Sequence, residues 1–262
     1  MRVFACASAI SLAWCGAADA APRRVASLNL CTDELLLMLA APDQIVSVTH
    51  LGRQPAETPL WRRARRYPPN DGSLLSVVAL RPDLVVTMGG GARDRLGIAR
   101  RLGVGTLDLP FPRTLGDTET GIKRMAAALG RPAAGRLVLA RLDRLKRSRP
   151  AAPVEAIWLG GGGRSMAAAG LGAQWMALAG FRQRPLKGDI VSLEHLLVRP
   201  PRVLLRSDYR GGQYSGEQRW LSHPLARGTG RSRTILTDGR PWTCMGPLMI
   251  GEVERLRARA QR

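Results

Sequence analysis

Two side chains near the start of the chain could act as a nucleophile and a base. Cys31 follows an apolar run at 25–30, and His50 lies near the end of a second such run at 45–51. A thiol at a helix N-terminus has a lowered pKa, and a neighbouring imidazole can take its proton. A thiol-dependent enzyme that uses Cys31 with His50 as its base is therefore one hypothesis.

A second cysteine offers Cys31 a different role. The chain has four cysteines, of which Cys6 and Cys15 lie close to the N-terminus and Cys31 and Cys244 lie farther along. In an oxidising compartment the last two can form a disulfide, which would leave no reactive thiol. Two separate buried thiols are the alternative, and both interpretations stay open because a sequence does not give the distance between two residues.

The first 20 residues have the pattern of a secretory signal peptide. A basic start at Arg2 precedes a mostly apolar run at 3–18, and the sequence Ala18-Asp19-Ala20 fits a small-x-small cleavage site. The apolar run is shorter than the about 20 residues that a membrane-spanning helix needs. We therefore predict cleavage near Ala20-Ala21 and export to the periplasm. A buried N-terminal helix of a cytosolic domain is the alternative.

Arginine dominates the charge of the chain. Lysine and arginine number 40 against 20 acidic residues, which gives a formal net charge of +20. Such a balance favours anionic ligands, anionic membrane surfaces or nucleic acid. The arginines are spread along the chain, without a basic arm or a zinc-finger spacing, so we expect no nucleic-acid partner. A basic protein that binds an anionic membrane surface is a third hypothesis beside the enzyme and a binding protein.

Short apolar runs alternate with helical patterns over most of the chain. Strands are predicted at 25–30, 45–51, 84–88 and 106–109 in a first half, and at 157–159, 203–205 and 234–236 in a second. Helices are predicted between them, for example at 33–39, 74–80, 93–102 and 173–178. Because this alternation implies parallel sheets with helices on both faces, the predicted fold class is α/β.

The segment 114–149 interrupts this alternation. It has apolar residues at helical spacing, and Gly130 and Pro132 divide it into two helices, since proline suits a first helical turn. A helix over 132–148 would be about 25 Å long, which is enough to bridge two lobes. The predicted organisation is a signal peptide at 1–20, an N-terminal α/β lobe at 21–113, a helical linker at 114–149 and a C-terminal α/β lobe at 150–262.

The two predicted lobes contain matching segments. Residues 73–86 align without gaps on residues 192–205, and each copy has a serine, a two-turn helix, a proline and a buried strand. One copy falls in each lobe, which favours two lobes of similar architecture.

Loops that follow the predicted strands could contact a ligand. The sequence Met88-Gly89-Gly90 and the glycine run before Arg164 allow close approach of the backbone to a bulky molecule, and neither has a phosphate-loop fingerprint. Tyr209 and Trp242 follow later strands. A tryptophan there could stack on a planar ring, and an arginine could bind a carboxylate. Ordinary turns and solvated side chains are the alternative for each of these loops.

The order of several motifs resembles the periplasmic binding proteins of iron-siderophore, cobalamin and haem importers. The first helix opens with Thr-Asp-Glu at 32–34, and a later one runs into Arg-Pro-Asp-Leu-Val at 81–85. The second lobe has Ala-Gly at 179–180, and His-Pro at 223–224 precedes the last strand. No single motif is specific, but their order covers most of the chain after residue 20.

This resemblance implies a function. The chain would be the substrate-binding component of an ABC importer, without enzymatic activity, a resident cofactor or a metal site of its own. It would work as a monomer, capture a metal chelate or corrin (ferric siderophore, cobalamin or haem) between two helix-linked lobes, and deliver it to an inner-membrane permease. The ligand would contact residues at the strand ends: Cys31, His50, Met88, Gly89, Gly90, Arg164, Tyr209 and Trp242.

The resemblance also implies a docking surface. In this family a glutamate on each lobe pairs with arginines of the importer. Glu194 occupies the matching position of the second lobe, in a first helical turn where a carboxylate is favoured. Leu75 occupies the first-lobe position. Docking by the first lobe is therefore expected to be weaker, to use the nearby Asp71, or to be absent.

Overall fold

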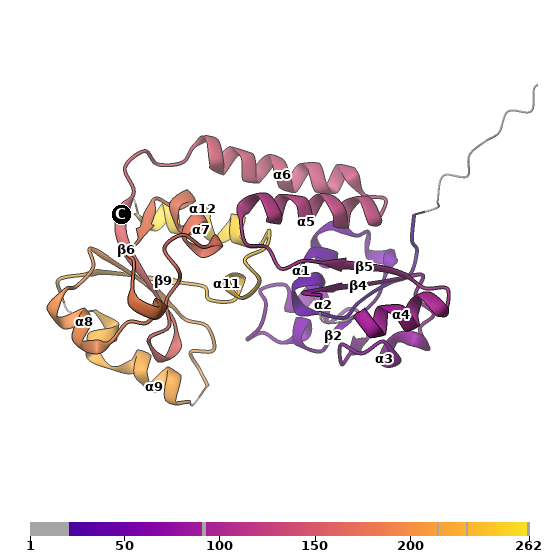
Figure 1. Cartoon of the computed structure of the whole chain (residues 1–262), viewed down its shortest axis with the longest axis horizontal. Helices are drawn as coiled ribbons and strands as arrows, with labels where there is room; N and C mark the ends of the chain where they lie inside the picture. The colour runs from indigo at the N-terminus through magenta and orange to yellow at the C-terminus, as the bar shows by residue number, and fades with distance from the viewer. Residues whose placement is uncertain (1–20, 91–92, 214, 229, 261–262) are drawn as a thin grey trace, which may run out of the picture.

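Two parallel β-sheets, each covered by helices, form the two lobes of the computed structural model (Figure 1). The structure describes residues 21–90, 93–213, 215–228 and 230–260, so the predicted signal peptide lies outside the described residues. No helix in the described ranges is long and apolar enough to cross a membrane. The predicted α/β class, with two lobes and parallel sheets, is confirmed.

The first sheet has the strand order β3-β2-β1-β4-β5. Residues that alternate along its central strands divide between two cores. Val25 and Val86 pack towards α1 (Leu30–Leu39) and α5 (Leu115–Ala128), whereas Ala26 and Val85 pack towards α3 (Leu75–Val78) and α4 (Arg93–Arg101). The elements of this lobe are β1 (Val25–Ser27), α1 (Leu30–Leu39), η1 (Pro42–Gln44), β2 (Ile45–Thr49), η2 (Leu51–Arg53), α2 (Trp61–Ala64), β3 (Pro69–Asn70), α3 (Leu75–Val78), β4 (Leu84–Met88), α4 (Arg93–Arg101) and β5 (Gly105–Leu109).

The second sheet has the order β7-β6-β8-β9 and the same layered arrangement. Leu205 of its central strand packs towards α6, α7 and α12, whereas the neighbouring Leu204 packs towards α8, α9 and α10. The elements are β6 (Val154–Leu159), η3 (Gly161–Gly163), α7 (Leu171–Leu178), β7 (Phe181–Gln183), η4 (Lys187–Asp189), α8 (Leu193–Val198), β8 (Val203–Ser207), α9 (Gly216–Ser222), α10 (Pro224–Arg227), β9 (Arg233–Thr237), α11 (Pro241–Cys244) and α12 (Met249–Ala260).

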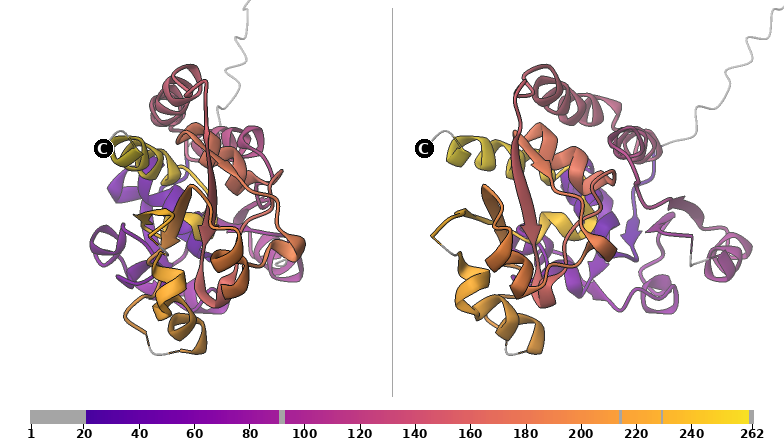
Figure 2. Two further views of the ribbon diagram at one scale, coloured as in Figure 1. Left: turned by 90° about the vertical axis from the view of Figure 1, so that its left-hand side faces the viewer. Right: turned by 60° about the vertical axis from the view of Figure 1, so that its left-hand side comes forward.

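Two packed helices connect the lobes, α5 (Leu115–Ala128) and α6 (Pro132–Arg147). α5 contributes Ile122 to the core of the first lobe, and α6 contributes Leu142 to the core of the second. The two helices cross closely, because a Cβ atom added at Gly135 would lie 2.7 Å from the Cβ of Ala126. α6 runs along the outer edge of the molecule in each view (Figures 1 and 2). The connection therefore joins two cores through helix packing rather than through an extended loop.

The observed elements differ from the predicted ones mainly at the edges. The predicted strand at 25–30 ends at Ser27, because Asn29 caps α1 by accepting a hydrogen bond from the backbone N–H of Cys31 at 2.9 Å. The sequence pattern does not predict the edge strands β3 and β7, which have two and three residues. Strands this short do not display a two-residue period.

Candidate ligand site between the lobes

Loops from the carboxyl ends of both sheets meet between the lobes. Cys31, after β1, is bonded to Cys244, after β9. Glu57, after β2, accepts a hydrogen bond from the hydroxyl of Tyr209, after β8. In parallel sheets all carboxyl ends lie at one edge, and open α/β sheets bind ligands outside that edge. The space between these loops is therefore the candidate ligand site.

The disulfide Cys31–Cys244 connects the two lobes. Its Cα atoms are 5.3 Å apart, and it joins the start of α1 to the end of α11. Both cysteines are buried in a small apolar cluster with Leu30, against which Leu51 and Met88 pack. Because the sulfur of Cys31 is bonded, the thiol-dependent enzyme hypothesis has no nucleophile at this position.

A hollow of about 480 Å³ opens on the second-lobe side. Its apolar wall includes Trp158 and Trp242, whose ring centroids are 5.9 Å apart. Trp242 is almost wholly buried, and it donates its indole N–H to the Thr237 hydroxyl at 2.8 Å. The lining also includes Arg164, Met166, Tyr209, Arg210, Glu217, Gln218 and Met245. Tyr209, Trp242 and Arg164 of the predicted set therefore line one hollow.

Tyr209 and Arg210, which line this hollow, also contact the other lobe. The Tyr209 hydroxyl donates to Oε2 of Glu57 at 2.7 Å, and Nη2 of Arg210 donates to Oε1 at 2.7 Å. Burial raises the pKa of the Tyr209 hydroxyl, and the hydrogen bond to Glu57 raises it further. Sequence reasoning did not select Glu57. It lies in a loop after a strand, as the predicted contacts do, but a single loop glutamate carries no specific signal.

The glycines after β4 form part of a second hollow, of about 570 Å³, on the first-lobe side. Gly89 has a φ of +103°, and a Cβ atom there would lie 2.3 Å from the ring of Phe111. Glycine is therefore required at this position by both backbone conformation and space. Gly90, Asp108 and Arg113 complete the wall, and Phe111 is 54% exposed.

The remaining predicted contacts differ in their surroundings. Met88 packs beside the disulfide, where it borders a void of about 20 Å³. Arg164 is exposed and forms an ion pair with Glu217 at 3.2 Å. His50 is exposed, with Nδ1 3.3 Å from the carbonyl oxygen of Asn70, and lines neither of the two hollows described above. The structure thus brings Tyr209, Trp242 and Arg164 together, and leaves His50 apart from them.

Two adjacent carboxyl groups are buried beneath the site, in the first turns of α1. Asp33 accepts hydrogen bonds from the backbone N–H of Thr49, at 3.1 Å, and from its hydroxyl. Burial raises the pKa of Asp33 to about 7. Burial raises the pKa of Glu34 to about 8, and the Thr58 hydroxyl lowers it only in part. Both groups are therefore largely or partly protonated near neutral pH.

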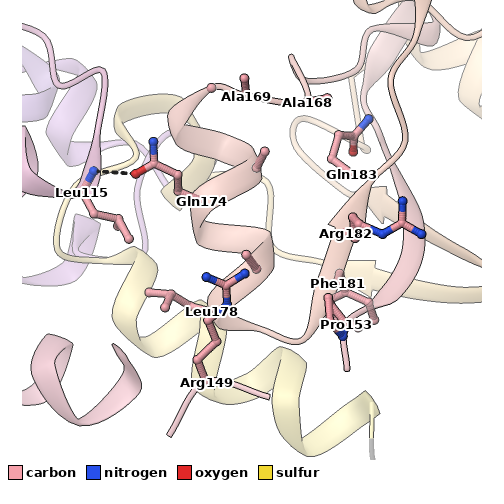
Figure 3. Close-up of a pocket in the computed structure, with 13 residues that line it drawn as sticks. Leu115, Arg149, Pro153, Ala168, Ala169, Gln174, Leu178, Phe181, Arg182 and Gln183 are labelled. Atoms are coloured by element: carbon pink, nitrogen blue, oxygen red, sulfur yellow. Dashed lines mark hydrogen bonds between the residues drawn. The ribbon is translucent and has the colours of Figure 1, made fainter. Parts of the chain in front are cut away.

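A further hollow has a volume of about 370 Å³, and the residues that line it are drawn in Figure 3. It lies where α7 and β7 meet the ends of the linker, and its lining includes Leu115, Arg149, Gln174 and Phe181. The Gln174 amide oxygen accepts a hydrogen bond from the backbone N–H of Leu115 at 3.0 Å, which ties α7 to the start of α5 (Figure 3). This hollow does not include the loops that meet between the lobes.

The predicted docking residues lie on exposed helices. Glu194 is exposed in the first turn of α8, which Ser192 caps, and it forms no ion pair with any described residue. Leu75 is 84% exposed at the start of α3. Asp71 is exposed just before this helix, and the Ser73 hydroxyl lowers its pKa to about 2. Both helices lie on the side of the molecule away from α6 (Figure 1).

Comparisons with known proteins agree with this architecture. A family model described as "Periplasmic binding protein" matches residues 25–230. A search of curated protein sequences finds no significant match.

Several solved structures share the fold. The periplasmic haem-binding protein of Pseudomonas aeruginosa has a TM-score of 0.65 at 19% identity, with 91% of this chain and 92% of that chain covered. The periplasmic haem-binding protein RhuT from Roseiflexus sp. RS-1 has a TM-score of 0.65 at 22% identity, covering 90% and 97%. The periplasmic vitamin B12 binding protein BtuF of Vibrio cholerae has a TM-score of 0.61 at 19% identity, covering 90% and 96%.

Proposed function

The chain belongs to the periplasmic binding protein family, and on this premise we propose that it captures a metal chelate or corrin between its lobes and delivers it to an ABC permease. One observation carries the proposal. Strand-end loops of both sheets meet between the lobes, and a hollow of about 480 Å³ with an aromatic wall and two arginines opens among the loops of the second lobe. That volume lies in the range of about 300–1,000 Å³ that is typical of small-molecule sites.

The side chains of the site support a ligand that brings its own metal coordination. The described residues include no group of three His, Cys, Asp or Glu side chains placed to hold a metal ion. Tyr209 stays protonated at neutral pH, because its pKa is raised by burial and by Glu57. A bare ion would therefore find few anionic ligands, whereas a chelated metal needs only stacking and hydrogen bonds. Structural relatives that bind haem and vitamin B12 agree with this class of ligand.

Tryptophan fluorescence tests the ligand proposal. Haem, cyanocobalamin and ferric siderophores of the catecholate and hydroxamate types are titrated into the mature chain, and at least one should change the emission saturably at micromolar concentration. Trp158 lines the hollow, so Trp158→Phe should remove much of the change. Trp61→Phe, in α2 under the stacked guanidinium groups of Arg62 and Arg65, is the matched control and should retain it. Binding of every compound only in the millimolar range would contradict the proposal.

We propose that Glu194 is the docking residue of the second lobe, with Asp71 or no acidic partner in the first. Immobilised wild-type protein, Glu194→Ala and Asp143→Ala are exposed to solubilised inner membranes of the source organism, and retained permeases are identified by mass spectrometry. Asp143 is an exposed acid on α6, on the other side of the molecule, and serves as the control. Glu194→Ala should lose permease retention but keep ligand binding. Equal retention by both variants would refute the assignment.

We also propose a monomeric protein in the periplasm, with the signal peptide removed near Ala21. Cell fractionation and N-terminal sequencing of the native protein test the location, and light scattering tests the oligomeric state. No catalytic step is part of this function.

A further inference from the structure

A single carboxylate of the first lobe pairs with two donors of the second. Glu57 is 4% exposed, and each of its carboxylate oxygens accepts a 2.7 Å hydrogen bond, one from Tyr209 and one from Arg210. Among the described residues, this is the only carboxylate within ion-pair distance of Arg210. A phenol and a guanidinium that converge on a carboxylate form a complete binding site for one anionic group.

The two donors are held in place by their own lobe. The backbone N–H of Tyr209 donates to the Ser207 hydroxyl at 3.2 Å, and the Gln218 amide donates to the Tyr209 carbonyl at 2.9 Å. The Arg210 guanidinium lies 5.1 Å from the centroid of the Tyr209 ring. These contacts do not involve Glu57, so the donors keep their relative positions without it.

The backbone conformation of Arg210 also indicates that its side chain is held in place by the surrounding lobe. Its φ is +54°, a left-handed conformation that costs a non-glycine residue about 1 kcal/mol or more and persists only where the surroundings impose it. Such conformations are concentrated at ligand sites, where they aim a side chain. Here the conformation places the guanidinium in the wall of the hollow.

Access differs between the two partners. The Arg210 side chain is 42% exposed and lines the hollow, whereas Glu57 is buried behind it. The neighbouring arginines are already paired within the second lobe: Arg164 with Glu217 at the rim, and Arg240 with Asp238 at 2.8 Å. Of the two arginines that line the hollow, Arg164 pairs with a carboxylate of its own lobe and Arg210 pairs with a carboxylate of the opposite lobe.

We propose that Tyr209 and Arg210 bind a carboxylate of the ligand, and that Glu57 occupies this anion site in the unliganded protein and is displaced. This inference rests on the proposed function and narrows its ligand to a carboxylate-bearing chelate or macrocycle. Glu57 competes with the ligand for the two donors. A ligand that displaces Glu57 replaces its two hydrogen bonds only if an anionic group of that ligand reaches both the Tyr209 hydroxyl and the Arg210 guanidinium. Displacement also removes the two hydrogen bonds of Glu57 between the lobes, whereas the Cys31–Cys244 disulfide still joins them.

Citrate is a simple carboxylate probe for this site, followed by calorimetry. Glu57→Gln keeps the size of the side chain and removes its charge. If Glu57 occupies the site about 90% of the time, its neutralisation should tighten citrate binding about tenfold. Arg210→Gln in the Glu57→Gln background should abolish that gain. Glu254→Gln removes a carboxylate of α12 that pairs with Arg141 and lines neither hollow, and it is the matched control, with a change below about twofold.

The outcomes separate this inference from the proposed function. Equal or weaker citrate binding by Glu57→Gln overturns the anion site, even if haem or a siderophore binds the wild type well. A citrate gain that depends on Arg210, without binding of any chelate or corrin, supports the anion site and contradicts the proposed function. If Glu57→Gln fails to fold by circular dichroism, Glu57→Asp replaces it. This variant shortens the side chain, so its carboxylate should reach the two donors less well and citrate should bind more tightly. An unchanged or weaker citrate affinity would refute the proposal.

Discussion

Removal of the Cys31–Cys244 disulfide should strongly destabilise the folded chain. The bond spans a sequence separation of 213 residues and joins the two lobes. Cross-linking residues so far apart lowers the entropy of the unfolded chain, and the loop-length relation for disulfides gives about 5 kcal/mol at 25 °C. Both cysteines are buried, so alanine is a better replacement than serine, whose hydroxyl would need a partner.

Urea unfolding measures this effect. The oxidised wild type, the wild type treated with a reductant and the double variant Cys31→Ala/Cys244→Ala are compared by tryptophan fluorescence and far-ultraviolet circular dichroism. Agreement of the two probes shows whether both lobes unfold together, which the free-energy comparison requires. The reduced wild type and the double variant should both lose about 5 kcal/mol, and the reductant should leave the double variant unchanged.

Two results would refute this reasoning. The first is a free energy of unfolding that differs by less than about 1 kcal/mol between oxidised wild type and double variant, since it would mean that the bond does not restrict the unfolded chain. The second is two free thiols in the native protein, by mass spectrometry after alkylation without reductant. That result would also restore the thiol-enzyme hypothesis for Cys31.

Three further predictions concern stability. Carboxyl groups with a raised pKa in the folded state, such as Asp33 (about 7) and Glu34 (about 8), hold their protons more tightly than in the unfolded chain. The stability that these two groups contribute should therefore be fully present below about pH 4 and should be lost as the pH rises towards 8. Glu34→Gln should reduce this loss, measured as the difference between the urea midpoints at pH 5 and pH 8. The same difference in the variant and the wild type would contradict the burial of Glu34. Gly89→Ala should cost about 1–3 kcal/mol because of its φ of +103° and the contact with Phe111, and a melting temperature equal to that of the wild type would exclude this strain. Arg257→Ala should lower the free energy of unfolding by about 2–4 kcal/mol, because the guanidinium donates three hydrogen bonds that connect α12 to α6 and α7. A loss below about 0.5 kcal/mol would show that these hydrogen bonds do not stabilise the fold.

The sequence predicts the buried central elements well. The predicted strand at 84–88 is observed over the same residues, since Pro82 and Gly89 bound a continuous apolar run. The two helices of the segment 114–149 are also observed, because Pro132 marks the start of the second one locally. Edge strands β3 and β7 are not predicted, because pairing with a neighbouring strand defines them rather than any local pattern.

The candidate site is predictable only in outline. The rule that ligands contact loops after parallel strands predicts Arg164, Tyr209 and Trp242, and the structure places these three residues at one hollow. The same rule could not separate them from His50, which lies apart. Glu57 and Tyr209 are 152 positions apart in the chain, so no local pattern links them.

The sequence by itself determined the α/β class, the parallel sheets and the helices that join the lobes, because these follow from periodicity, proline and glycine positions within short segments. Only the tertiary structure decided that Cys31 is bonded to Cys244 and that Arg210 pairs with a carboxylate of the other lobe. These pairings depend on distances between residues that are remote in sequence, and such distances are set by how the two sheets pack against the linker helices. The chemistry of the site therefore resides in contacts that no single segment encodes.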